Sequence, residues 1–351
     1  MEEEEKALLG LNTVPGLGPA GLARMVASAG GAAALAREPR RWWGTLKNPP
    51  PCPAPSFLVH EGALQAEVVE QSGARVLTPG NPEWPAHLDH LAHPPPMLVI
   101  KGNAAALGPR PGIAVIGARA CTPYGREQAR RFGASLAVAG HRVVSGAARG
   151  IDQSAMHGAV DMGGTVLAVC GCGIDRVYPP EAAPLLEALL EEGGAVVTEF
   201  PCGMAPVPGN FPRRNRLIAA LSQAVLVIQA TVRSGSLNTV GWALELGREV
   251  FAVPGPVDSP VSRGPHKLLR DGATLAETPA DLLASPTLDP RADTPLLKVL
   301  SEADASLDEL ALTLDKEPDT LLEEIATLEV EGRVMRRPGG IYHRCGPSAP
   351  D

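Results

Sequence analysis

Between residues 112 and 255 the chain alternates short apolar runs with longer stretches of helical composition. The apolar runs are GIAVIG (112–117), HRVVSG (141–146), GTVLAVCG (164–171), GAVVTEF (194–200), AVLVIQA (224–230) and EVFAVPG (249–255). The intervening stretches predict helices over 123–140, 152–162, 181–192, 212–222 and 236–247. Short apolar strands that alternate with helices indicate an α/β fold with an open, mostly parallel, doubly wound sheet. Ligands of such sheets bind beyond the carboxyl ends of the strands.

The chain has 351 residues, enough for two or three domains. Residues 1–80 predict a small helical domain, interrupted by NPPPCPAPS (48–56), which has the composition of a linker. Residues 57–77 predict a helix and then a strand, followed by a proline-rich lead-in to the central domain. The central domain is predicted over 81–285, and 286–294 reads as a second linker.

The last segment, 295–351, predicts helices over 296–302, 306–314 and 318–330, followed by the hairpin EGRVMRRPGGIYHR. Three helices and a hairpin are the outline of a winged helix. The segment carries 6 Lys and Arg residues against 12 Asp and Glu residues, and its third helix is acidic. A recognition helix that held DNA would carry cations there. A structural or partner-binding role is therefore favoured, although Arg333, Arg336 and Arg337 keep a DNA role open.

The segment PGLGP (15–19) lies between two apolar helical stretches near the N-terminus. A tight helical hairpin of this kind can offer backbone N–H groups to a DNA phosphate. The same residues also suit a helix-turn-helix packing unit that binds no ligand. The packing unit is favoured, because only Lys6 and Arg24 lie near enough in the sequence to assist a phosphate, and the DNA contact stays open as the alternative.

The net charge is −8, which by itself argues against a nucleic acid ligand, but the charges are unevenly distributed. Residues 96–285 carry 17 Lys and Arg residues against 15 Asp and Glu residues, and all but two of these cations are arginine. Arginine is suited to bidentate contact with phosphate. An acidic chain with an arginine-rich middle indicates a focused phosphate site rather than a broad cationic surface.

Composition also bears on compartment, membrane and metal. The chain starts MEEEEKALLG, where a signal peptide would be basic, and no run of about 18 apolar residues predicts a membrane span. The six cysteines form no CxxC pair, which favours reduced thiols in a cytoplasm. Cys170 and Cys172 are explained by a strand end facing the core, since no partner lies at zinc-ligand spacing. No metal and no cofactor are predicted.

Four loops with small residues follow the predicted strands and should converge on one rim of the sheet. They are Gly117-Ala118-Arg119, the loop from Ser145 and Gly146 through Arg149 and Gly150 to Asp152, Gly171-Cys172-Gly173, and Ser234-Gly235-Ser236. Small residues let backbone N–H groups approach an anion closely, and Arg119 and Arg149 add charge. We expect an anion site here, with Asp152 as a helix N-cap. Thr122-Pro123 is a second predicted cap, at the start of the helix over 123–140.

The stretch NFPRRNRLIAAL (210–221) adds a different feature. Arg213, Arg214 and Arg216 surround Asn215 directly after Phe211, at a predicted loop-to-helix junction. Arginines and an exposed aromatic ring suit a nucleic acid strand, with guanidinium groups on phosphates and a base stacked on the ring. Cations at a helix N-terminus oppose the macrodipole, and an anionic ligand would explain why the chain keeps them there.

Enzymatic readings find less support in the residues. The first glycine loop is GARACTPYG rather than G-x-G-x-x-G, and no P-loop lysine or Ser/His/Asp set is evident. Asp152 and Glu245 could act as acid–base groups, and His157 suits a core or capping role better than that of a base. The rival function is a nucleotide-processing hydrolase on a similar fold. The element PGGxGTxxE expected for it is replaced by RSGSLNTVGWALE (233–245).

Six segments in order resemble the DNA-processing protein A family (DprA, also called Smf). They are AVIGARACTPYG, VVSGAARGIDQSAMHGA, GTVLAVCGCGIDRVYPPE, NFPRRNRLIAALS, RSGSLNTVGWALELGREVFAVPG and GPHKLLRDGA. The resemblance covers roughly residues 80–285. It implies a Rossmann-like core with a small N-terminal helical domain (SAM or helix-hairpin-helix type) and a C-terminal winged helix.

The resemblance also implies a function without catalysis. Members bind incoming single-stranded DNA in natural transformation, protect it and help to load the RecA recombinase, typically as cytoplasmic homodimers. Carried over to this chain, the DNA pocket falls on Gly117 and Arg119, on Ser145 to Asp152, and on Phe211 with Arg213–Arg216. Ser234 and Gly235 belong to the same rim, and the dimer or RecA surface falls around Leu268 and Leu269. Binding of duplex DNA stays open.

Four positions depart from the family pattern. Pro180 and Pro208 stand where many members carry basic side chains, so that affinity is lower or Arg176, Arg213 and Arg214 replace those contacts. Met156 and Gln229 replace a small and an acidic residue, and we interpret both as packing changes. An acidic chain with few cations predicts modest, salt-sensitive DNA binding that dimerisation strengthens.

Overall fold

The structure is a computed structural model that describes residues 1–108, 112–283, 295–330, 334–337 and 340–344. It divides into two compact units, Met1–Leu288 and Asp289–Asp351, each described by itself below. The predicted linker 286–294, Arg333 and Cys345 lie outside the described residues. No helix within the described ranges is long and apolar enough to cross a membrane.

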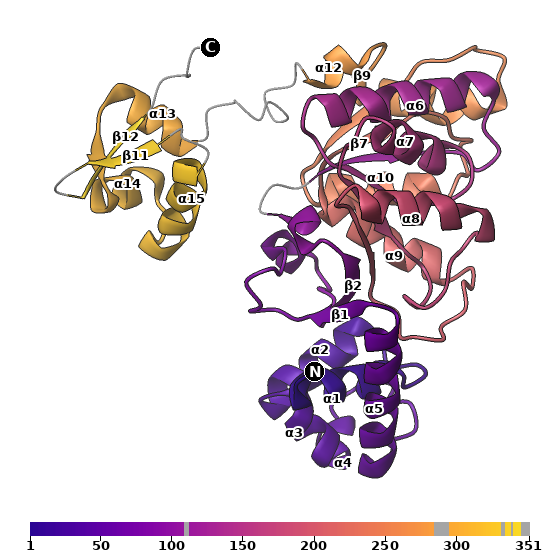
Figure 1. The fold of residues 1–351 in the computed structure, drawn as a ribbon, viewed down its shortest axis with the longest axis vertical. Helices are drawn as coiled ribbons and strands as arrows, with labels where there is room; N and C mark the ends of the chain where they lie inside the picture. Colours follow the sequence, from indigo (N-terminus) through magenta and orange to yellow (C-terminus); the bar gives the residue numbers. More distant parts are fainter. Residues whose placement is uncertain (109–111, 284–294, 331–333, 338–339, 345–351) are drawn as a thin grey trace. The chain divides into compact units, whose positions relative to one another are not determined.

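The first unit is built on a nine-stranded sheet in the order β1-β2-β6-β5-β4-β3-β7-β8-β9. Figure 1 labels β1, β2, β7 and β9 among its strands. The strands are β1 (Ala74–Leu77), β2 (Leu98–Gly102), β3 (Gly112–Ile116), β4 (Val143–Ser145), β5 (Val166–Val169), β6 (Ala195–Thr198), β7 (Ser222–Val227), β8 (Glu249–Ala252) and β9 (Thr274–Leu275). From β6 to β9 all neighbours are parallel, whereas β1 and β2 add an antiparallel edge. The predicted doubly wound sheet is confirmed.

Helices cover both faces of this sheet. α6 (Pro123–Val138), α7 (Ile151–Val160) and α8 (Ala183–Glu191) pack in one core cluster, and α9 (Asn210–Ala220) and α10 (Ser236–Glu245) pack in another. Strand β3 contributes side chains to both core clusters. Ile113 and Val115 belong to the first cluster, whereas Ala114 and Ile116 belong to the second. The predicted cap is confirmed, since the Thr122 hydroxyl accepts a hydrogen bond from the Gly125 amide at 3.2 Å.

Strand β3 lies between β4 and β7, where the order of the strands reverses. The chain passes from β3 outward to β4, β5 and β6, and then returns to the other side of β3 with β7, β8 and β9. The loops after β3 and β7 therefore diverge from one another at the carboxyl ends. Such a switch point leaves a crevice in which doubly wound proteins bind ligands.

The N-terminal residues form helices with a core of their own. They are α1 (Glu3–Asn12), α2 (Pro19–Ala29), α3 (Ala32–Arg37), α4 (Pro39–Trp43) and α5 (Pro55–Gln71). This core reaches the sheet, since Met97, Val99 and Cys202 belong to it. The predicted helix and strand over 57–77 match α5 and β1, but β2 was missed within the proline-rich lead-in. The division at residue 80 stays a prediction.

The second unit contains α13 (Pro295–Glu302), β10 (Ala305–Ser306), α14 (Leu307–Leu314), α15 (Pro318–Val330), β11 (Val334–Arg337) and β12 (Ile341–Arg344). Its strands pair in the order β10-β12-β11. The predicted three helices and following strand pair are confirmed. Ser306 and Glu309 form a capping box at the start of α14, with the Glu309 amide donating to the Ser306 hydroxyl at 3.3 Å.

α6 and α7 pack against each other at glycine positions. A Cβ atom added to Gly133 would lie 2.0 Å from the Ala155 carbonyl oxygen, and one added to Gly158 would lie 2.1 Å from the Arg130 carbonyl oxygen. Both obstacles are backbone atoms, which cannot move aside without shifting a helix. The glycines therefore set how closely these two helices approach.

We expect Gly133→Ala to lower the free energy of unfolding by about 1–3 kcal/mol, because the new methyl group overpacks the helix contact. Urea denaturation monitored by circular dichroism measures this. Gly241→Ala is the matched control, since Gly241 lies in α10 and an added Cβ would meet open space there. It should be neutral or stabilising by up to about 1 kcal/mol. Equal effects of the two substitutions would contradict the packing account.

Candidate nucleic-acid interface

A cleft of about 660 Å³ lies at the switch point of the sheet. The loops after β3 and β4 and the start of α10 line it, as do residues of α9. A smaller hollow of about 30 Å³ adjoins it and is lined by residues of the third loop, including Gly171, Cys172 and Tyr178. The four loops singled out in the sequence thus come together, with Gly117, Arg119, Ala148, Gly171 and Gly235 among the lining residues.

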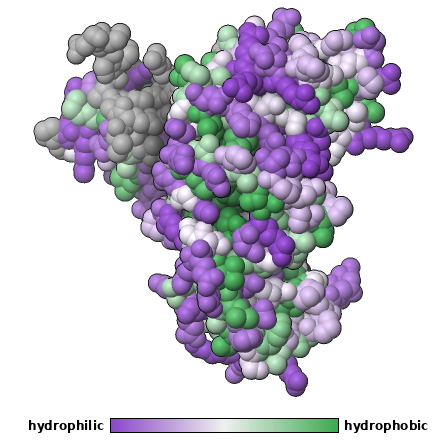
Figure 2. All heavy atoms as spheres, turned by 45° about the vertical axis from the view of Figure 1, so that its right-hand side comes forward, coloured by the Kyte–Doolittle hydropathy of each residue, from purple (hydrophilic) through white to green (hydrophobic). Residues whose placement is uncertain are grey.

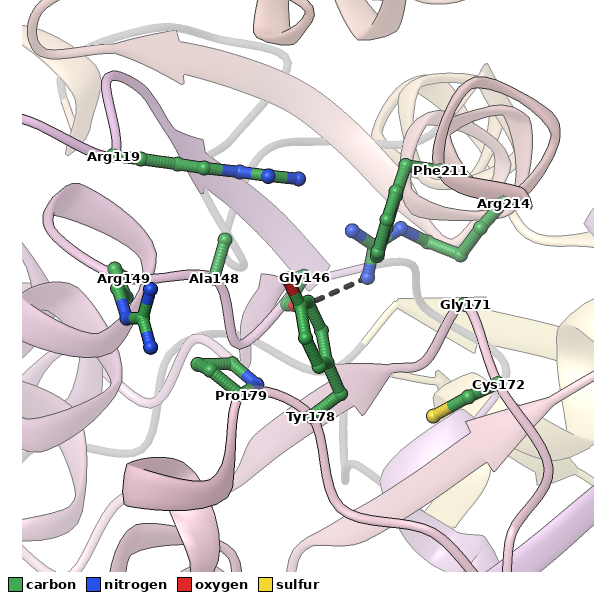
Figure 3. A pocket seen from close by; sticks show the side chains of 10 residues that line it. All are labelled: Arg119, Gly146, Ala148, Arg149, Gly171, Cys172, Tyr178, Pro179, Phe211 and Arg214. Carbon is green, nitrogen blue, oxygen red and sulfur yellow. Dashed lines mark hydrogen bonds between the residues drawn. The ribbon is translucent and has the colours of Figure 1, made fainter. Parts of the chain in front are cut away.

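A cation and two aromatic rings face the hollow (Figure 3). The Arg119 guanidinium lies over the Phe211 ring, 4.9 Å from its centroid. The rings of Tyr178 and Phe211 are 5.6 Å apart and tilted by 36°. Gly171 lets Phe211 approach, because a Cβ at this position would lie 3.0 Å from the ring. Arg119 is exposed, so its charge is available at the surface.

Asp152 occupies the position that we had expected an anionic ligand to take. Its carboxylate accepts hydrogen bonds from the amides of Gly146 (3.2 Å) and Ala148 (3.3 Å), and also from that of Gly117. These loop amides are therefore not free to bind phosphate. The prediction of Asp152 as N-cap is wrong, because α7 starts at Ile151 with Gly150 as its cap. Burial raises the pKa of Asp152 to about 6, against the opposing effects of Arg214 and the three amides.

Arg214 is the second buried charge beneath the cleft, with only 4% of its surface exposed. Its Nη1 donates to the carbonyl oxygens of Gly146 (2.9 Å) and Val169, and its Nε donates to the Asn215 side chain at 3.3 Å. Burial lowers the pKa of the Arg214 guanidinium, and nearby Asp152 opposes this effect. Arg214 thus links the ends of β4 and β5 to α9.

Arg213 and Arg216 share a buried carboxylate, that of Glu199, which follows β6. Arg213 Nε donates to Glu199 at 3.0 Å, and Arg216 Nη2 donates to its other oxygen. Glu199 and Arg216 are both buried. Both arginines belong to α9, as the helix predicted over 212–222 implies, but the expectation that their guanidinium groups meet a nucleic acid is not met, because Glu199 pairs with both. The cations at this helix N-terminus are explained by Glu199 and by backbone carbonyls, not by a ligand.

The remaining predicted residues fall into buried and exposed sets. Ser145 is fully buried and donates to the Val115 carbonyl at 2.7 Å, so it does not line the cleft. Asn215 is also buried and donates to the Gly235 carbonyl at 3.2 Å. Ser234 lies at the rim with its hydroxyl 2.6 Å from that of Ser236. Gly235 is exposed beside it.

Arg149 lies at the rim as an exposed ion pair with Glu181. Its Nη2 donates to Glu181 at 3.1 Å. This hydrogen bond lowers the pKa of the Glu181 carboxyl. Exposed pairs of this kind contribute little to stability because water screens them, so an incoming phosphate can compete with Glu181 for Arg149.

Sequence reasoning missed Tyr178, Glu181 and Glu199. Tyr178 stands in YPP, two positions before Pro180, which departs from the family pattern, and that was the available signal. Gln229, which we interpreted as a packing change, is buried and tied to the start of α6. Its amide group accepts from the Thr122 amide at 3.0 Å and donates to the Thr122 hydroxyl at 2.8 Å.

Thiols and carboxylates near the cleft form no metal site in the described part of the chain, where no group of three such side chains or histidines comes together. Burial raises the pKa of Cys170 to about 12 and also raises that of Cys172. Both thiols are therefore protonated near neutral pH and serve as small apolar groups beneath the loops.

The fold agrees with comparisons with known proteins. The family described as DNA recombination-mediator protein A matches residues 75–286. The chain belongs to this family. Protein Smf of Escherichia coli is 43% identical over 215 residues, which are 61% of this chain and 57% of that protein. A DNA processing protein DprA of Mycobacterium tuberculosis, named as putative, is 37% identical over 315 residues, 80% of each chain.

Two solved structures of family members are similar to this one. DprA from Streptococcus pneumoniae superposes with a TM-score of 0.66 at 29% identity, covering 81% of this chain and 98% of that one. DprA from Helicobacter pylori, whose structure is described in terms of its single-stranded DNA binding mode, gives 0.55 at 28% identity. That match covers 60% of this chain and 95% of the other.

The buried carboxyl of Asp152 predicts a pH dependence of stability. Its pKa is about 6 in the fold against 3.8 ordinarily, so the folded state binds the proton more tightly. Relative to Asp152→Asn, the wild-type free energy of unfolding should rise as pH falls from about 6 to about 4, by about 2 kcal/mol. Urea denaturation of both proteins across this range measures the difference. A difference that stays constant or shrinks would contradict it.

Proposed function

We propose that this chain binds single-stranded DNA in the cleft at the switch point. The observation that carries the proposal is the exposed Arg119 beside the half-buried rings of Phe211 and Tyr178 at the rim. An arginine beside accessible aromatic rings suits a strand whose bases are unpaired and whose backbone is charged. The single-stranded DNA binding mode described for the Helicobacter pylori relative supports it.

In this proposal the exposed and buried charges have different tasks. Arg119 neutralises a backbone phosphate, and Arg149 leaves Glu181 to neutralise another. A base stacks on Phe211 next to Tyr178, while Ser234 and Gly235 line the same cleft. Asp152, Arg213, Arg214 and Arg216 touch no DNA and hold the rim in shape.

We further propose that the chain is a recombination mediator of natural transformation, which protects incoming single-stranded DNA and helps to load RecA onto it. The support is its family and the relatives named as DNA processing proteins. The proposal includes a cytoplasmic location, a homodimer, and binding without catalysis. The second unit, with its helices and strand pair, is proposed to be a winged helix.

The proposed dimer or RecA surface involves the helix α11 (Arg263–Arg270). Leu268 packs partly against the core beneath it. Leu269 instead lines a surface hollow with Val232, Val257 and His266. Of the two leucines singled out in the sequence, Leu269 is therefore the one we expect a partner to contact.

The cleft proposal predicts that Phe211→Ala weakens binding of a labelled oligothymidylate roughly 5- to 100-fold, the loss of one stacked base.

Arg119→Ala should weaken binding similarly for all sequences and make the salt slope about 0.7 less steep, the contribution of one phosphate contact on a single strand. Fluorescence anisotropy titrations at several salt concentrations measure both quantities.

Arg131→Ala is the matched control, because Arg131 is an exposed arginine on α6 that does not line the cleft. It should leave affinity unchanged. An unaltered affinity of Arg119→Ala would remove Arg119 from the interface. Displacement of the oligonucleotide by nucleoside monophosphates, together with their turnover, would favour the hydrolase instead.

A further inference from the structure

A second groove is lined by residues from the first turns of α6 and from α7. Its volume is about 300 Å³, and it is lined by Pro123, Arg126, Glu127, Arg130, Ser154 and His157. No residue of this groove lines the cleft. Figure 2 shows strongly hydrophilic side chains gathered over the upper part of the molecule, where Figure 1 places α6.

The helices that line the groove, α6 and α7, directly follow loops that line the cleft. α6 follows the Arg119 loop and α7 follows the Arg149 loop, so both helices leave from the same rim. The two loops touch there, since the Ile151 amide donates to the Ala118 carbonyl at 3.3 Å. A Cβ atom on Gly150 would lie 2.5 Å from the Arg119 carbonyl oxygen. A strand that leaves the cleft past Arg119 therefore meets the head of this groove.

The groove carries charges of both signs. Arg126 and Arg130 would attract a polyanion, whereas Glu127 would repel it. Arg126 is exposed and has no carboxylate partner in the part of the chain that the structure describes. Arg130 is paired with Asp161 at the surface, and His157 is exposed across from it. Glu127 is the opposing charge. Arg126 and Arg130 lie on one face of α6 with a rise of about 6 Å between them.

We propose that this groove continues the path of the single strand, so that nucleotides beyond those in the cleft lay their phosphates along α6 and α7. The inference rests on the proposed function of the cleft. Arg126 is the main contact, Arg130 and His157 flank it, and Glu127 limits the affinity. The ligand is the phosphodiester backbone of a strand already held at Phe211. Because charged and polar residues predominate among those that line the groove, and none of them is an exposed large apolar side chain, the groove suits a backbone better than a peptide.

The test compares two lengths of labelled oligothymidylate, about six and about twenty nucleotides, by fluorescence anisotropy. Arg126→Ala should keep its affinity for the short strand and lose about 3- to 10-fold for the long one, with a salt slope about 0.7 less steep. Glu127→Gln should bind the long strand a few-fold more tightly. Arg131→Ala removes an equal charge from the same helix outside the groove and should change neither.

Equal losses of Arg126→Ala on both lengths would overturn the inference, because Arg126 would then act in the cleft. An unchanged affinity for the long strand would overturn it too. Both results leave the proposed function of the cleft intact. If the wild-type protein bound neither length, the proposed function itself would fail, and the groove could not extend its path.

Discussion

The cleft depends on two opposite charges buried beneath its rim. The Asp152 carboxylate accepts hydrogen bonds from backbone amides of the loops after β3 and β4. The Arg214 guanidinium donates hydrogen bonds to backbone carbonyls at the ends of β4 and β5. Each charge satisfies backbone groups that a sheet cannot pair at its carboxyl edge. Because unpaired buried polar groups are costly, this arrangement fixes three strand ends relative to α9. The positions of Arg119 and Phe211 follow from it.

Most of the arginines that suggested a phosphate site in the sequence turn out to build the protein. Arg213 and Arg216 pair with the buried Glu199, whose carbonyl also accepts a hydrogen bond from Asn12 of the N-terminal helices at 3.0 Å. The helical region is thereby tied to the segment that leads into α9. The charges left at the surface around the cleft, Arg119 and Arg149, are few. Modest and salt-sensitive binding is the expected consequence.

The sheet could be predicted because strands that are buried on both faces consist of apolar residues, and these strands are visible in the sequence as short apolar runs between helices. The convergence of the loops followed from the parallel topology alone. The fate of Arg213 and Arg216 could not be predicted, because the sequence does not distinguish an arginine that contacts a phosphate from one that pairs with a buried carboxylate fourteen or more positions away, here Glu199. Asp152 was misassigned because an aspartate near the start of a helix suits two roles. It can cap the helix, or it can accept hydrogen bonds from amides of the preceding loop, as it does here. Strand β2 was missed because three prolines precede it and its segment was assigned to a proline-rich lead-in.

The most direct test of this account is photocrosslinking of a 5-iododeoxyuridine oligonucleotide to the full chain, with the attachment sites mapped by mass spectrometry. Iodouracil crosslinks to aromatic rings on which it stacks. The account predicts attachment at Phe211 or Tyr178 and loss of the crosslink when unlabelled single strand is added. Attachment confined to residues outside the cleft, with none at these two rings, would contradict it.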